Sequence, residues 1–109
     1  MDAEIFLLPS LTDLRKQREA HTLLGKLLDR TWEKQLREMG WTITTTGTLI
    51  GSPFWRDSGR GRRIFDAWVA ELDLRRDPER SYSDAISLAA RGNVGGVYVV
   101  VQVELESRT

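Results

Sequence analysis

The feature that most constrains the fold is the strict alternation of side chains from Val97 to Glu106. Every second residue of this segment is a valine or a leucine, and the residues between them are mostly polar towards the end. Alternation with a period of two is typical of a strand with one buried face. The segment therefore predicts a long strand and, with it, a domain built around a sheet.

A helix is predicted from Thr12 to Met39. Its apolar residues Leu24, Leu28, Trp32 and Leu36 recur every four positions. This spacing places them on one stripe of a helix, and we expect the stripe to face the sheet.

The ends of this helix carry recognisable signals. Ser10 or Thr12 can cap its start, and Gly40 suits a left-handed helix end. A single helix of this length would measure about 42 Å, which is long for so small a domain. A break near His21, with Thr22 capping a second helix, is therefore an open alternative.

The middle of the chain is harder to interpret. Residues 41–50 are rich in β-branched side chains and predict a strand, in which Gly47 marks a bulge. Residues 51–63 contain three glycines, a proline and four arginines, which predicts a long loop. Residues 64–74 fit either a helical stripe or an alternating strand. We favour the strand because the alternation continues up to the turn at Asp77-Pro78.

The remaining elements complete a topology. Residues 81–92 begin with a cap-like Ser-Tyr-Ser-Asp and are predicted to form a short helix, and residues 4–8 a first short strand. The order β-α-β-β-α-β predicts an α+β fold of the split-βαβ, ferredoxin-like type. This fold has an antiparallel sheet with two helices on one face, and we expect it to form a single domain over residues 1–109.

Composition excludes several functions. The 109-residue chain has 16 basic and 16 acidic side chains and no cysteine. Zero net charge argues against attraction of the whole surface to nucleic acid or to an anionic membrane. Without cysteine there is no disulfide, thiolate nucleophile, iron–sulfur cluster or cysteine-ligated zinc. The first residues resemble neither an export signal nor a membrane anchor, so we expect a cytoplasmic protein with no membrane partner.

Catalytic signals are weak. His21 is the only histidine and lies in a polar run, where a solvated helix residue is expected. The acid pairs Glu71/Asp73 and Glu104/Glu106 would each share a strand face, which is typical of a solvent-exposed edge. No glycine motif for nucleotides is present. We therefore expect no catalytic residue, no metal site and no cofactor.

The most distinctive stretch is the arginine-rich segment 54–63, which has four arginines and one aspartate. Arginine forks bind phosphate, and aromatic rings stack on bases, but the same residue types are enriched where proteins contact proteins. The candidate binding residues of this segment are Phe54, Trp55, Arg56, Arg60, Arg62 and Arg63.

Together these observations predict a small non-catalytic protein that binds another macromolecule, as an adaptor, an inhibitor or an assembly component. The favoured partner is a protein, and the alternative is a nucleic acid bound by the loop 54–63. If the strand 97–106 lies at a sheet edge, Tyr98 and Val100 become candidate residues of a homodimer interface. An enzyme is the least favoured class.

Overall fold

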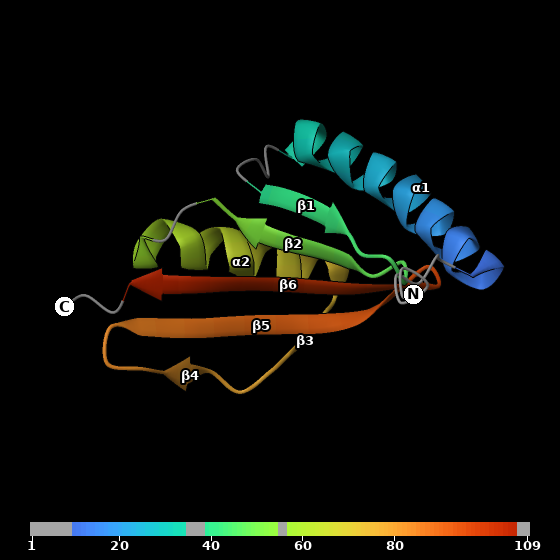
Figure 1. Ribbon diagram of the computed structural model, residues 1–109. Helices are drawn as coiled ribbons and strands as arrows, with labels where there is room; N and C mark the ends of the chain where they lie inside the picture. The colour runs from blue at the N-terminus through green and yellow to red at the C-terminus, as the bar shows by residue number, and fades with distance from the viewer. Residues whose placement is uncertain (1–9, 35–38, 55–56, 107–109) are drawn as a thin grey trace, which may run out of the picture.

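The computed structural model describes residues 10–34, 39–54 and 57–106, which form two helices and one six-stranded sheet (Figure 1). In chain order the elements are α1 (Leu11–Lys34), β1 (Met39–Ile43), β2 (Leu49–Pro53), α2 (Ser58–Leu72), β3 (Arg75–Arg76), β4 (Arg80–Ser81), β5 (Ala85–Val94) and β6 (Val97–Glu106). The predicted α+β class is confirmed, whereas the predicted first strand at residues 4–8 lies outside the described residues. Neither described helix combines the length and the apolar composition that a bilayer-spanning segment requires.

The sheet is mixed rather than antiparallel, and its strand order is β1-β2-β6-β5-β3, with β4 also pairing with β5. The long strand predicted at 97–106 is β6, and it lies in the interior of the sheet. It runs parallel to β2 on one side and antiparallel to β5 on the other. The ferredoxin-like arrangement is therefore not what the structure shows, because two segments were assigned to the wrong element type.

The first wrong assignment concerns residues 64–74, which belong mainly to helix α2 and not to a strand. The buried residues of α2 have helical spacing: Phe65, Trp68, Val69 and Leu72. The misleading alternation came from Leu74, which is buried but lies beyond the end of the helix. Asp73, which lies between Leu72 and Leu74, has a left-handed backbone conformation with φ 53° and ends α2.

The predicted loop 51–63 is largely ordered secondary structure. Strand β2 extends to Pro53, and α2 already begins at Ser58. The Asp57 carboxylate accepts a hydrogen bond from the backbone N–H of Arg60 at 2.9 Å, which caps the helix. The arginines at 60, 62 and 63 therefore lie on the first two turns of a helix.

The second wrong assignment concerns residues 81–92, most of which form β5 instead of a helix. Ile86, Leu88 and Ala90 point to the core side, in register with the buried face of β6. Gly95 and Gly96, with φ of 58° and 90°, form the two-residue connection between β5 and β6. Positive φ at both central residues is the requirement of a tight hairpin turn.

The strand predicted at 41–50 is in fact a hairpin. Strands β1 and β2 pair antiparallel, and the turn between them includes Gly47 with φ 85°. Gly47 also contacts α1, since a Cβ atom built on it would lie 2.5 Å from the Cβ of Lys16. The glycine therefore serves a turn and a close helix contact rather than a bulge.

Helix α1 is continuous, so the alternative break near His21 does not occur. Its start is capped reciprocally by Ser10 and Asp13, whose side chains each accept the backbone N–H of the other at 3.0–3.2 Å. The predicted core stripe is wrong at Leu28 and Trp32, which are 52% and 86% exposed.

The residues of α1 that are fully buried are Ala20 and Leu27, and Leu24 packs beside them. Strict four-residue spacing rotates by about 40° per step around a helix, because four residues exceed one turn of 3.6. Trp32 is therefore about 80° away from Leu24, while Leu27 stays on the core side. Leu36, the last residue of the predicted stripe, lies outside the described residues.

The core lies between the helices and one face of the sheet. Helix α2 packs behind the sheet in the view of Figure 1, against the odd-numbered residues of β6. Helix α1 lies along the β1 side and adds Ala20 and Leu27 to the same apolar cluster. Neither of the two described helices covers the opposite face of the sheet.

Candidate binding face on the open side of the sheet

We call the sheet surface opposite α2 the open face. Its residues follow from strand register, because β6 places its odd-numbered residues in the core and its even-numbered residues on the other side. The open face includes Gly40 and Thr42 of β1, Ile50 and Ser52 of β2, Tyr98, Val100, Gln102, Glu104 and Glu106 of β6, and Ser87, Ala89 and Arg91 of β5. No helix of the described chain covers it (Figure 1).

The open face contains a hollow of 690 Å³ that crosses four strands. Small residues line it, namely Gly40, Ser52 and Ser87, and Gln102 and Glu104 of β6 supply longer polar side chains. The hollow is open to solvent. Its lining offers hydroxyl, amide and carboxylate groups to a bound molecule.

Phe54 forms the apolar rim of this hollow. Its side chain is 68% exposed although it directly follows the buried Pro53. The ring lies over Gly40, since a Cβ atom on that glycine would approach Phe54 Cε1 to 3.1 Å. Aromatic side chains are enriched among the residues through which proteins contact one another.

A second cluster on the open face surrounds Arg91. Its guanidinium donates hydrogen bonds to both carboxylate oxygens of Asp77, one of them through Nε at 3.2 Å. Hydrogen bonding to Tyr98 and then to Asp77 raises the pKa of Arg91 further above its usual range. Arg75 of β3 is the direct neighbour of Arg91 in register, so two cations lie side by side with one acid.

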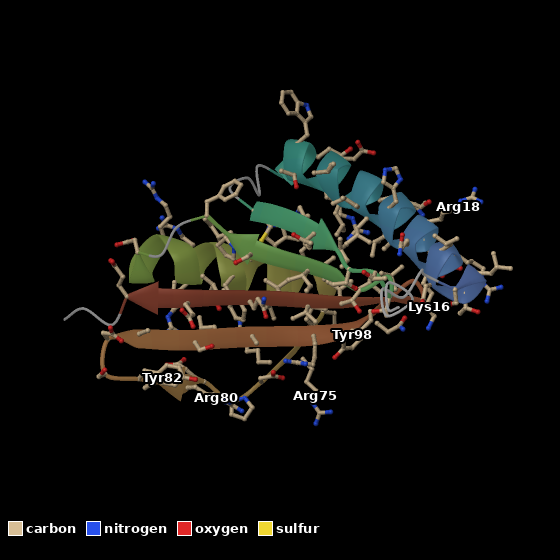
Figure 2. The ribbon with its side chains drawn as sticks, viewed as in Figure 1. Lys16, Arg18, Arg75, Arg80, Tyr82 and Tyr98 are labelled. Carbon is tan, nitrogen blue, oxygen red and sulfur yellow. The ribbon has the colours of Figure 1, made fainter. Side chains whose placement is uncertain are left out.

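Arg75 and Arg80 form no ion pair within the described residues. Figure 2 shows both at the β3–β4 border of the sheet, with Tyr82 beside Arg80 and Tyr98 on the side of Arg75. Like charges on adjacent strands repel unless a partner neutralises them. At this border Arg75 and Arg80 thus differ from Arg76, Asp77 and Glu79, which all form ion pairs.

The predicted arginine-rich segment is not one site. Trp55 and Arg56 lie outside the described residues. Arg62 forms an ion pair with Glu79 at 3.2 Å, which links α2 to the β3–β4 connection. Arg60 and Arg63 are exposed on α2 beside the capping Asp57. Of the described residues of this segment, Phe54 is the one that borders the hollow on the open face.

The two candidate interface residues of β6 have different environments. Tyr98 is 43% exposed near the β5–β6 turn, whereas Val100 is only 8% exposed between Ile50 and Arg91 in register. Because β6 is paired on both sides, the premise that it is an edge strand is wrong. The backbone of β6 is thus not available for strand addition.

The other titratable candidates are dispersed. His21 is exposed on α1. Glu71 lies on α2 and pairs with Arg30 of α1 at 3.5 Å, and Asp73 ends α2, so these two acids do not share a strand face. Glu104 and Glu106 do share the open face of β6. Within residues 10–34, 39–54 and 57–106, no three side chains of the His, Asp and Glu types are grouped to hold a metal ion.

The sequence did not predict the open face, because residues 81–92, most of which form β5, were assigned to a helix and residues 51–63 to one loop. The signal that could have found it is the pair Gly95-Gly96, which marks a tight hairpin and hence a strand before it. The even-numbered residues from Tyr98 to Glu106 then indicate a long uncovered surface. Comparison of the chain with models of known families, with curated proteins and with solved structures found no match.

Proposed function

We propose that this protein is a small binding protein, an adaptor, an inhibitor or an assembly component, that docks another protein on the open face of its sheet. The observation that carries the proposal is the hollow of 690 Å³ with the exposed Phe54 at its rim. Protein interfaces are enriched in aromatic anchors surrounded by polar groups. Phe54 supplies the anchor, and Ser52, Ser87 and Gln102 supply the polar groups.

The chemistry of the lining defines the partner. The floor is made of small residues and admits a protruding side chain, and Glu104 is the one charged residue among those that line the hollow. The expected partner segment therefore presents an apolar side chain to Phe54 and a basic or hydrogen-bond-donating group to Glu104 and Gln102.

The test is selection of a random-peptide display library on the immobilised protein. Selected peptides should lose at least about 30-fold in affinity for Phe54→Ser, the loss typical of a strong contact residue. Ser87→Arg, which fills the floor of the hollow, should abolish binding. Tyr82→Ser is the matched control, because Tyr82 is an exposed aromatic residue away from the hollow.

Circular dichroism should show all three variants folded. Peptides that bind Ser87→Arg as well as they bind wild type would overturn the proposal, and so would a selection that enriches no peptide at all.

A second candidate function, nucleic-acid binding, is favoured by one observation. Arg75 and Arg80 lie at one border of the open face without an acidic partner among the described residues, and the exposed Tyr82 lies beside Arg80, with the exposed Tyr98 on the side of Arg75 (Figure 2). Cations with an adjacent aromatic ring suit a single strand, whose phosphates and bases they contact. This border, rather than the segment 54–63, is where the structure favours such a contact.

Fluorescence anisotropy with single-stranded DNA and RNA at several salt concentrations tests this candidate. Each lost phosphate contact lowers the slope of log affinity against log salt by about 0.7. Replacing Arg75 and Arg80 by Ala should therefore lower it by about 1.4, whereas the control, Ala at Arg60 and Arg63, should leave it unchanged. A lower slope for the Arg60 and Arg63 variant alone would assign nucleic-acid binding to the segment 54–63. If the wild-type chain bound neither DNA nor RNA, nucleic-acid binding would be excluded.

A further inference from the structure

Helix α1 carries a second apolar line that the core does not use. The large hydrophobic side chains that are exposed in the described chain are Leu11, Leu14, Leu28 and Trp32 of α1, together with Phe54, Tyr82 and Tyr98. The four on α1 belong to one series with alternating spacings of three and four residues. We call this series the α1 seam: Leu11, Leu14, Arg18, His21, Gly25, Leu28 and Trp32.

The spacing of the α1 seam is that of a helix–helix contact. Steps of three and four residues average 3.5, which keeps side chains on one line of a helix, as in coiled coils. All seven residues of the seam are exposed, and it is distinct from the core line of Ala20, Leu24 and Leu27. The helix thus has one apolar line against its own domain and another towards solvent.

The middle of the seam permits close approach of another helix. Gly25 is exposed, and a Cβ atom built on it would meet no atom within 4 Å. A glycine inside an exposed helix lowers helix stability by about 1 kcal/mol relative to alanine. A small residue at this position lets a second helix backbone come close, which is a reason for the glycine.

Four charges on or beside the seam favour one direction of the partner. Arg15 and Arg18 lie in the first half of α1, whereas Asp29 and Glu33 lie in the second half, although each half as a whole has three basic and two acidic residues. None of the four forms an ion pair with another described residue. A second α1 in antiparallel orientation brings Arg15 and Arg18 of each copy towards Asp29 and Glu33 of the partner subunit. A parallel partner instead sets Arg18 against Arg18 and aligns the helix dipoles.

We propose that the α1 seam binds the α1 seam of a second copy of this chain, antiparallel, about a twofold axis between His21 and Gly25. In this register Leu14 faces Trp32 of the partner subunit, and Arg18 faces Leu28 of the partner subunit. The same contacts repeat across the axis, as an isologous interface requires. The surface is separate from the hollow on the open face, so self-association and the docking of another protein are independent.

Disulfide trapping tests both the contact and its direction, because the wild-type chain has no cysteine. The variants are Arg18→Cys and Leu28→Cys, each with a distinct mass tag. In the antiparallel register, residue 18 faces residue 28 of the partner subunit, so the two copies of residue 18 are ten residues apart along the helix. At 1.5 Å per residue this separates them by about 15 Å, and the same holds for the two copies of residue 28. That exceeds the Cα separation of about 7 Å at which a disulfide can form.

The expected result is a mixed disulfide when the two variants are combined and no disulfide when each is oxidised alone. Disulfides within each single variant would show a parallel pair and overturn the antiparallel register. Arg63→Cys combined with Arg18→Cys is the control for random collision, since Arg63 is exposed on the other helix. A mixed product no more abundant than this control would overturn the contact itself.

Sedimentation of the wild-type chain provides an independent measurement. Replacing Leu28 and Trp32 together by Ser should raise the dimer dissociation constant at least about 30-fold, whereas Tyr82→Ser should not change it. Arg18→Glu should weaken the dimer, and adding Asp29→Arg in the same chain should restore it. Ser87→Arg should leave the dimer intact, so failure of this proposal is distinguishable from failure of the binding function.

Two further outcomes would overturn the proposal. A wild-type monomer at high micromolar concentration that dimerises only after deletion of residues 2–9 would show that the chain's own first residues occupy the seam. A monomer with and without that deletion would overturn self-association altogether.

Discussion

The indole rings of Trp41 and Trp68 meet edge to face, with their centroids 5.1 Å apart and their planes inclined by 84°. This contact joins β1, at one border of the sheet, to α2, which covers its centre. Aromatic pairs in this geometry contribute about 0.5–1.5 kcal/mol beyond their burial. The hairpin that carries Gly40, Ser52 and Phe54 is thereby fixed to the core, which holds the rim of the hollow in place.

The first prediction concerns Gly51, which pairs with Trp41 across the hairpin. A Cβ atom at Gly51 would lie 2.5 Å from the Trp41 ring, so Gly51→Ala must displace the ring from Trp68. We expect a loss of about 1–3 kcal/mol in the free energy of unfolding, the usual range for overpacking.

Urea denaturation measures this loss. The control is Gly59→Ala, where the new Cβ would meet only Asp57 Oδ2 at an ordinary 3.5 Å. It should be neutral or stabilising by up to about 1 kcal/mol, because it lies inside helix α2. Equal stability of the two variants would contradict the ring contact.

The second prediction compares neighbouring leucines of α1. Leu27 is fully buried, whereas Leu28 is half exposed. Leu27→Ala should cost about 2–5 kcal/mol, and Leu28→Ala less than about 1 kcal/mol in protein dilute enough to be monomeric. Chemical denaturation of the pair at the same low concentration decides the matter. A larger loss of stability for Leu28→Ala than for Leu27→Ala would show that Leu28 belongs to the core, as the four-residue spacing predicts.

The third prediction follows from the interior position of β6. Val100 is almost fully buried and its strand is paired on both sides, so Val100→Lys must bury a charge or distort the sheet. We expect destabilisation of at least about 2 kcal/mol by thermal or chemical unfolding. Gln102→Lys, two residues further along the same face and exposed, should be nearly neutral. A folded Val100→Lys variant with a changed oligomeric state would instead support an interface at this strand.

The sequence predicted those elements in which one pattern dominates. Strand β6 was predicted correctly because its alternation is uninterrupted. Most of α1 was predicted correctly as a helix, but its four-residue spacing chose the wrong face at Leu28 and Trp32. Residues 64–74 were misassigned because Trp68 and Leu72, four apart, satisfy both periods, and the buried Leu74 extended the wrong one. Two features favour the helix over the strand for these residues: α2 packs against β6, and Asp57 caps the start of α2.

Residues 85–94 show a different limit. Their alanines and the preceding Ser-Tyr-Ser-Asp are favourable for a helix, yet ten consecutive residues pair with β6. Strand pairing is decided by a neighbour that the local sequence does not reveal. The open face depended on this assignment, so of its contact residues only Phe54, Tyr98 and Val100 were anticipated.

The fourth prediction concerns the boundary between the arginine-rich segment and α2. The Asp57 carboxylate accepts the Arg60 N–H, and α2 has no acidic residue in its first turn. Because no other described acid compensates the exposed N–H groups there, Asp57→Ala should cost about 1 kcal/mol and loosen the first turn. Hydrogen–deuterium exchange should then accelerate at residues 60–62, whose N–H groups are the first with a partner, but not at the C-terminal half of α2, where Trp68 and Leu72 are buried. Asp57→Asn, which keeps an accepting oxygen, should restore most of the protection. Fast exchange over residues 61–63 in the wild-type chain itself would show that this stretch is the loop that its composition predicts, and that Arg60, Arg62 and Arg63 are not held on a helix.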